Sequence, residues 1–338
     1  MREVYKLTLI LKRYFPINFA RITLIAQMVL ALIKVRTVCL SEVATGFSGK
    51  AEAASNEKRI HRFLKDFPLD KEAIARFIAS KLPEGQWILT MDRTFWEFGR
   101  LKINILMLAV VHKGVAIPLL WQFLGEPDSG KKGNSDTGER IELISRFIRL
   151  FGAERIGSLC ADREFIGSEW FRWLRAEGVP ACIRIRQNQY ITDSEGVAGQ
   201  GSVLFGGLKP GESRILRGCR KVGDVSVYIS GMKLSDGELL IVASSDNPET
   251  ALKMYAERWQ IETMFACLKT KGFRFESTHL RDLERIDKLL GIVTVSFVWA
   301  YLVGDHLDGI NPVHIKKLSD IGQKVYSGTD TIISEKSL

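Results

Sequence analysis

The chain has 338 residues, of which 46% are hydrophobic and 26% are charged, as in globular proteins that bury a substantial core. This composition argues against a disordered or fibrous chain. Lysine and arginine outnumber aspartate and glutamate by 48 to 39, so the net charge is +9, which favours an anionic partner such as nucleic acid. Residues 1–80 carry most of the excess, with 14 basic and 7 acidic side chains.

The five cysteines are widely spaced and form no Cys-x-x-Cys pair, so neither structural zinc nor a disulfide framework is expected. Two apolar stretches are interpreted as buried helices. Residues 17–35 contain charged side chains, and residues 291–302 are too few to span a bilayer. Charged residues also interrupt the earliest apolar residues, so no secretory signal is expected. We therefore expect a cytoplasmic protein with no membrane partner.

Residues 1–82 are expected to form a helical, basic DNA-binding region. Apolar residues recur there at three-to-four spacing, as in amphipathic helices. Within it, the segment 57–65 places several cations around a narrow apolar seam. Its Lys58, Arg59 and Arg62 are candidates for contacts with DNA phosphates, and a solvated helix face is the alternative interpretation.

From residue 83 the apolar pattern changes to the period of β-strands. We expect strands at 87–91, 103–111 and 115–123, a helix at 139–151, a strand at 156–161, a helix at 168–177 and a strand at 181–186. This order predicts a ribonuclease H-like α/β core, in which a mixed sheet has helices on both faces. Its first part is expected to span 83–189.

The remaining chain completes this core around an insertion. Residues 190–246 are rich in glycine and short alternating runs, which predicts an inserted β subdomain. Helical patterns at 248–271 and 283–306 are expected to complete the core over 247–310. A polar C-terminal tail, 311–338, follows.

Two aspartates follow predicted strands of the core. Asp92 comes directly after 87–91, and Asp162 comes directly after 156–161. If these strands are neighbours, the two carboxylates can converge on one divalent cation, because Mg²⁺ prefers hard oxygen ligands. Each aspartate taken alone is better explained as a turn or helix-cap residue.

A third carboxylate belongs to the predicted helix at 248–271. At about 100° per residue, Tyr255, Arg258, Glu262 and Lys269 fall on one side of this helix, beside an apolar arc. The alternative is an ordinary amphipathic helix in which Arg258 and Glu262 form a surface ion pair, worth only about 0.3–0.5 kcal/mol.

The spacing Tyr255-x2-Arg258-x3-Glu262-x6-Lys269 resembles the YREK signature of DDE transposases of the insertion sequence four family. The residues around the two aspartates, Met-Asp-Arg-Thr and Ala-Asp-Arg-Glu, resemble the two aspartate motifs of that family. The basic segment near the N-terminus also resembles its amino-terminal region. The resemblance extends over nearly the whole chain.

The resemblance implies a transposase of a bacterial insertion sequence with a catalytic triad of Asp92, Asp162 and Glu262. These residues would bind two Mg²⁺ or Mn²⁺ ions. Two such ions activate an attacking water or 3′-hydroxyl and stabilise the leaving oxygen. The implied partners are DNA, both element ends and target, and a second copy of the chain in a synaptic homodimer.

The resemblance also assigns DNA phosphate contacts to Tyr255, Arg258 and Lys269. Arg163, beside Asp162, is a further candidate, with a structural salt bridge as the alternative. Relatives pass through a hairpin intermediate and stack a flipped base on an aromatic residue of the insertion, often tryptophan. The insertion in this chain has no tryptophan, which leaves three candidates for stacking: Tyr190, Phe205 and Tyr228.

Two other functions remain open from the sequence. A ribonuclease H-like nuclease that cuts DNA without joining it would share the triad. An inactive DNA-binding protein derived from a transposase would keep the basic surface without activity. In either case we expect the protein in the bacterial cytoplasm, associated with the nucleoid when bound to DNA.

Overall fold

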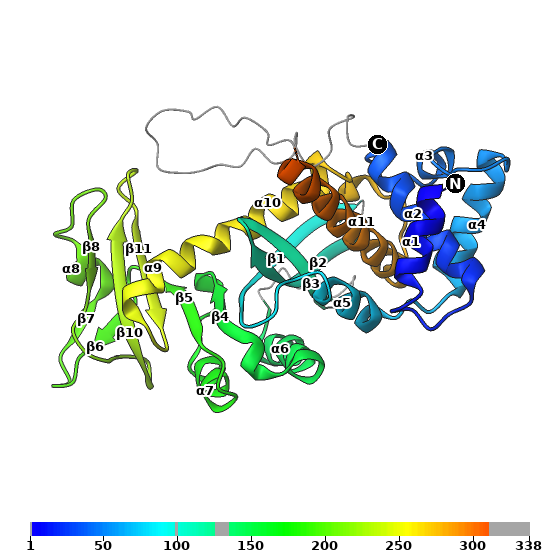
Figure 1. The fold of residues 1–338 in the computed structure, drawn as a ribbon. Helices are drawn as coiled ribbons and strands as arrows, with labels where there is room; N and C mark the ends of the chain where they lie inside the picture. The colour runs from blue at the N-terminus through cyan, green and yellow to red at the C-terminus, as the bar shows by residue number, and fades with distance from the viewer. Residues whose placement is uncertain (1, 99–100, 126–134, 311–338) are drawn as a thin grey trace. The chain divides into compact units, whose positions relative to one another are not determined.

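The computed structural model describes residues 2–98, 101–125 and 135–310 (Figure 1). The chain forms two compact units, Pro83–Thr263 and a second made of Met1–Leu82 with Met264–Leu338. The predicted tail 311–338 and most of the loop expected at 125–138 lie outside the described residues.

The unit Pro83–Thr263 is built on one mixed sheet of eleven strands in its described part. The strands are β1 (Trp87–Phe98), β2 (Leu101–His112), β3 (Val115–Phe123), β4 (Ile156–Ala161), β5 (Ala181–Ile185), β6 (Tyr190–Thr192), β7 (Ala198–Gln200), β8 (Ser213–Ile215), β9 (Arg220–Val222), β10 (Val225–Lys233) and β11 (Leu239–Ser244). The helices are α6 (Thr137–Phe151), α7 (Ser168–Ala176), α8 (Gly201–Phe205), α9 (Pro248–Ala256) and the start of α10 (Gln260–Ala266), with 3₁₀ turns at Ala153–Arg155, Arg163–Phe165 and Glu257–Trp259.

The first five strands have the predicted topology. Their spatial order is β3-β2-β1-β4-β5. The pairs β1–β2 and β2–β3 are antiparallel, whereas β1–β4 and β4–β5 are parallel and are connected through α6 and α7. The predicted fold class, a ribonuclease H-like mixed sheet with helices against it, is confirmed.

The inserted strands continue the sheet of the core. β11 pairs antiparallel with β5, and β10 pairs antiparallel with β11 (Figure 1). The short helix α8 packs closely on β10 at Gly231, where an added Cβ would lie 2.5 Å from the ring of Phe205. This position therefore requires glycine, and Phe205 is fully buried by the contact.

Helices cover both faces of the core sheet, as the contacts of two successive side chains of β1 show. Trp87 packs its ring edge-on against Phe147 and Phe151 of α6. The next residue, Ile88, packs on the cluster around Cys160 that includes residues of α9. Because successive side chains of a strand point to opposite faces, α6 and α9 lie on opposite sides of β1.

The second unit is helical in its described part, as predicted for its N-terminal region. It contains α1 (Arg2–Leu11), α2 (Phe19–Val35), α3 (Leu40–Thr45), α4 (Ala53–Asp66), α5 (Lys71–Ala79), a π-helical turn (Cys267–Lys271), a 3₁₀ turn (Phe275–Ser277) and α11 (Leu283–Ile310). Side chains cap α2 and α5 at their N-termini: Asn18 accepts from the Arg21 N–H, and Asp70 accepts from the N–H groups of Glu72 and Ala73.

The helix α11 is 28 residues long and apolar enough to cross a membrane. The expectation that this apolar run is too short to span a bilayer was therefore wrong. However, 78% of its most apolar window is buried within the structure, where it packs against α2, α4 and α5. This burial supports the interpretation of α11 as a core helix.

Candidate active site

Asp92 and Asp162 lie on the same face of two paired parallel strands. Asp92 shares its face of β1 with Ile88, and Asp162 follows Cys160 with the alternation of β4. The parallel pairing of β1 with β4 ends at Met91 and Ala161, one residue before each aspartate. β1 itself continues to Phe98, so the expectation that Asp92 ends its strand was wrong. What ends beside Asp92 is the pairing with β4.

The helical segment that follows the insertion changes its winding three times. Tyr255 lies in the last turn of α9, Arg258 lies in a 3₁₀ turn, and Glu262 lies in the first turn of α10. A π-helical turn follows, and it contains Lys269. The predicted continuous α-helix is therefore interrupted, and the calculation at about 100° per residue does not hold along its whole length.

The guanidinium of Arg258 joins two of the three predicted catalytic carboxylates. Its Nη1 donates to Asp92 Oδ2 at 2.9 Å, and its Nη2 donates to Glu262 Oε1 at 2.8 Å. The Arg258 side chain is 5% exposed and that of Asp92 is 17% exposed, whereas that of Glu262 is 59% exposed. The Arg258–Asp92 pair is thus shielded from solvent, so it is less weakened by water and salt than a surface pair.

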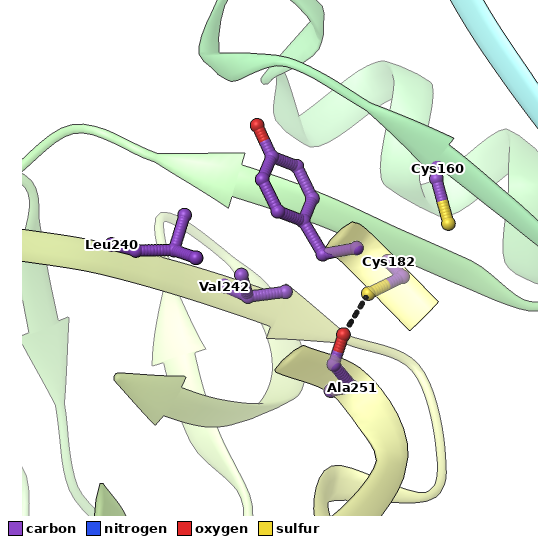
Figure 2. Packing of buried hydrophobic residues seen from close by; sticks show 6 residues of the cluster. Cys160, Cys182, Leu240, Val242 and Ala251 are labelled. Atoms are coloured by element: carbon purple, nitrogen blue, oxygen red, sulfur yellow. Dashed lines mark hydrogen bonds between the residues drawn. The ribbon is translucent and has the colours of Figure 1, made fainter. Parts of the chain in front are cut away.

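Tyr255 contacts the third carboxylate. Its side chain is fully buried in a cluster with Cys160 and Cys182 (Figure 2). In the same cluster, Cys182 Sγ donates to the Ala251 carbonyl at 3.1 Å. The Tyr255 hydroxyl donates to Asp162 Oδ1 at 3.2 Å. Burial raises the pKa of Tyr255 above its usual range, so the hydroxyl keeps its proton and remains a donor.

A second arginine network supports the turn that carries Asp162. Arg93 Nε donates to both carboxylate oxygens of Glu164, at 2.9 and 3.1 Å. The buried Arg140 of α6 donates to the Glu164 carbonyl at 3.1 Å and to Ser135, and its guanidinium lies 5.0 Å from the ring centre of the neighbouring Phe165. The sequence did not reveal Arg140, because a single arginine on an amphipathic helix carries no signal of burial.

Asp92 is the carboxyl whose ionisation the surroundings change most clearly. Burial raises the pKa of Asp92 to about 6, although the charge of Arg258 and a hydrogen bond from the Arg93 N–H both act to lower it. The charges of Glu164 and Asp162 raise it further. Asp162 is therefore near enough to Asp92 for the two carboxylates to repel each other.

The three carboxylates have the right chemistry for a divalent metal, but their present contacts are not those of a metal site. Among the described residues, no three acidic, histidine or cysteine side chains stand together in a metal-binding arrangement. Arg258, a cation, bridges Asp92 and Glu262, and thus stands in for the positive charge that these oxygens would otherwise need. Asp92, Asp162 and Glu262 fit Mg²⁺ or Mn²⁺ provided that Arg258 releases at least one of them.

The remaining candidates lie in other surroundings. Lys269 belongs to the helical unit and pairs there with Glu276 at 2.9 Å. On α4, Lys58 and Arg62 are exposed, whereas Arg59 is half-buried and donates to Asn56 at 3.2 Å. Further candidates lie in the sheet unit: Arg163, Tyr190 and Tyr228 outside its core, and the buried Phe205.

The raised pKa of Asp92 predicts that Mg²⁺ stabilises the protein more at about pH 8 than at about pH 5. The pKa of Asp92 rises from 3.8 to about 6 on folding, so the folded state binds the extra proton. The resulting stabilisation is complete below pH about 4 and is lost as pH rises through about 6. Mg²⁺ binds the ionised form, and so opposes this loss.

The measurement is the melting temperature with Mg²⁺ and with EDTA at both pH values. Asp92→Asn should remove most of the pH dependence of the Mg²⁺ effect, and Glu169→Gln, at an exposed carboxylate of α7, should preserve it. An equal shift in melting temperature at both pH values in the unsubstituted protein would contradict the prediction.

Comparison with known proteins agrees with this geometry. Residues 87–299, more than half of the chain, match a family model described as the transposase DDE domain. The match begins with β1, which carries Asp92, and extends past Glu262 into α11. A search of curated proteins gave no match. Asp92 and Asp162 thus lie side by side at the end of the β1–β4 pairing, and Arg258 links Asp92 to Glu262. Because the family model matches more than half of the chain, the chain belongs to the family of DDE transposase domains.

Proposed function

We propose that the protein is the transposase of a bacterial insertion sequence, which binds the element ends, cleaves the DNA and joins the freed 3′-hydroxyl to target DNA. The observation that carries this proposal is the contact of one guanidinium with both Asp92 and Glu262, on the same face as Asp162. These three carboxylates are far apart in the sequence, and a structural ion pair at the surface would not require their common face.

Asp92, Asp162 and Glu262 would hold two Mg²⁺ or Mn²⁺ ions. Such ions activate a water or 3′-hydroxyl and stabilise the departing oxygen in phosphoryl transfer. The protein's own contribution is to hold these carboxylates in position. Tyr255 orients Asp162 through its hydroxyl, and the buried environment of Asp92 limits competition from water.

Tyr255 and Arg258 have a second role in this proposal, as contacts to DNA phosphates near the cleaved end, and for this the buried Tyr255 would have to move its hydroxyl away from Asp162. The Nε of Arg258 is buried and donates to no acceptor in the described chain, so this side chain keeps one unused hydrogen-bond donor. We infer that the guanidinium pairs with carboxylates before DNA arrives and turns to a phosphate afterwards. Phosphate oxygens accept the same forked pair of hydrogen bonds as a carboxylate.

Further DNA contacts are proposed for basic residues around this centre and in the helical unit, which would position the strands without reading their sequence. They are Lys269, Arg163, Lys58, Arg59 and Arg62. Of the aromatic candidates for base stacking, Tyr190 is the exposed one at 58%, whereas Phe205 is fully buried and would need to leave the core. We further propose that two copies join in the synaptic complex, in the bacterial cytoplasm.

The test is a strand-transfer assay with the purified protein, Mg²⁺, labelled element ends that already carry a free 3′-hydroxyl, and a supercoiled target plasmid. We expect covalent joining of the labelled ends to the plasmid. Cleavage of uncut ends without joining would instead identify a nuclease. Binding without either reaction would identify an inactive DNA-binding protein and contradict the proposal.

A further inference from the structure

An open cavity of about 440 Å³ lies in the sheet unit, and its lining residues are Arg163, Arg186, Gln187 and Asn188. Its lining residues come from the ends of neighbouring strands. Arg163 is the second residue after β4, and Arg186 is the first residue after β5. β4 and β5 are parallel, so both carboxyl ends open at one edge of the sheet, where ligands of such sheets commonly bind.

The two arginines of this cavity are uncompensated cations. Both are exposed, and neither side chain forms a hydrogen bond or an ion pair with any residue in the described part of the chain. The neighbouring Arg184 is different, because its guanidinium pairs with Glu238 at 2.5 Å. Two like charges at one cavity repel each other, and an anion bound between them would remove that repulsion.

The other lining residues add hydrogen-bonding groups without adding negative charge. Gln187 Nε2 donates to the Leu239 carbonyl at 3.4 Å, which holds this side chain against β11. Asn188 is exposed, and its amide has no partner among the described residues. The cavity therefore offers two guanidinium forks and an amide donor, a set that suits the non-bridging oxygens of a phosphodiester.

We propose that this cavity binds an internucleotide phosphate of the DNA substrate, close to the phosphate that is cleaved. The proposal rests on the proposed function, and it deepens that function by assigning Arg186, Gln187 and Asn188 to DNA together with Arg163. The cavity lies close to the proposed catalytic centre, because its residue Arg163 directly follows Asp162 in the sequence. The cavity fixes where the strand runs and is not part of the chemistry itself.

The experiment compares DNA binding by the unsubstituted protein, Arg163→Gln/Arg186→Gln and Arg217→Gln. Arg217 is a matched control, since it is exposed, lies in the same unit and has no partner in the described chain. Affinity for a short fluorescein-labelled duplex of an element end is measured by anisotropy over a range of salt concentrations in Ca²⁺. We expect the double substitution to reduce the salt slope by about 1 and Arg217→Gln to leave it unchanged.

A second series of binding measurements identifies which phosphate of the DNA occupies the cavity. Single phosphates near the cleavage position are replaced one at a time by neutral methylphosphonate. The unsubstituted protein should lose affinity at one or two positions at which the double variant is no longer sensitive. Arg163→Lys/Arg186→Lys should restore part of the salt slope, which separates lost charge from misfolding.

A double variant with the original salt slope and the original sensitivity at every position would overturn the proposed phosphate site. The proposed function fails in a different way, namely if the unsubstituted protein itself neither binds the element end nor joins it to target DNA.

Discussion

Asp92→Asn, Asp162→Asn and Glu262→Gln are each expected to abolish both DNA cleavage and strand transfer while DNA binding persists. Each substitution removes an anionic oxygen from the group proposed to hold the two metal ions. A loss of about three orders of magnitude in rate corresponds to about 4 kcal/mol of transition-state stabilisation, within the range expected for metal-ion catalysis. The affinity for element-end DNA should fall little, because phosphate contacts by basic residues supply most of it.

The measurement pairs single-turnover cleavage and joining assays in Mg²⁺ with binding assays in Ca²⁺. Glu169→Gln is the matched control, because it removes an exposed carboxylate of the same unit and should retain full activity. Circular dichroism would show that each variant remains folded. Near-normal cleavage by any one of the three triad variants would remove that residue from the catalytic assignment.

The core of the sheet was predictable because strand periodicity is a local property. The predicted runs 156–161 and 181–186 became β4 and β5 within one residue. The run 87–91 was predicted too short, since β1 extends to Phe98 through Asp92, Arg93 and Glu97. Charged residues interrupt the apolar pattern there, and pairing with β2 maintains the strand in spite of them.

The carboxylates were predictable as residues, but their contacts were not. Arg258 and Asp92 are 166 positions apart, and a helix considered alone offers Arg258 only Glu262 as a partner. Similarly, Tyr255 was expected on a polar stripe facing DNA, whereas the structure buries its ring and directs its hydroxyl to Asp162. Only the packing of α9 on the sheet determines both contacts.

Arg258→Ala is expected to destabilise the metal-free protein strongly and to make it depend on Mg²⁺. Removing the guanidinium leaves Asp92, which is only 17% exposed, without its counter-ion. Breaking a fully buried pair costs about 3–5 kcal/mol, and the cost here is expected at or below the lower end, because Asp92 can take up a proton instead. The contact with the exposed Glu262 should contribute little to this loss. Urea unfolding in EDTA measures the effect, and Arg172→Ala, at an exposed pair with Asp224, should change stability by less than about 1 kcal/mol.

The same substitution should change metal binding and catalysis in opposite directions. Because Arg258 and a metal ion compete for Asp92 and Glu262, Arg258→Ala should bind Mg²⁺ more tightly, by roughly tenfold, or about 1.4 kcal/mol. Strand transfer should nevertheless fall, since the proposed phosphate contact is also lost. Calorimetric titration with Mg²⁺ and the joining assay measure the two quantities on one protein. If Mg²⁺ affinity were unchanged or weaker, the guanidinium would not occupy the place of the metal, and its contacts with Asp92 and Glu262 would be structural only.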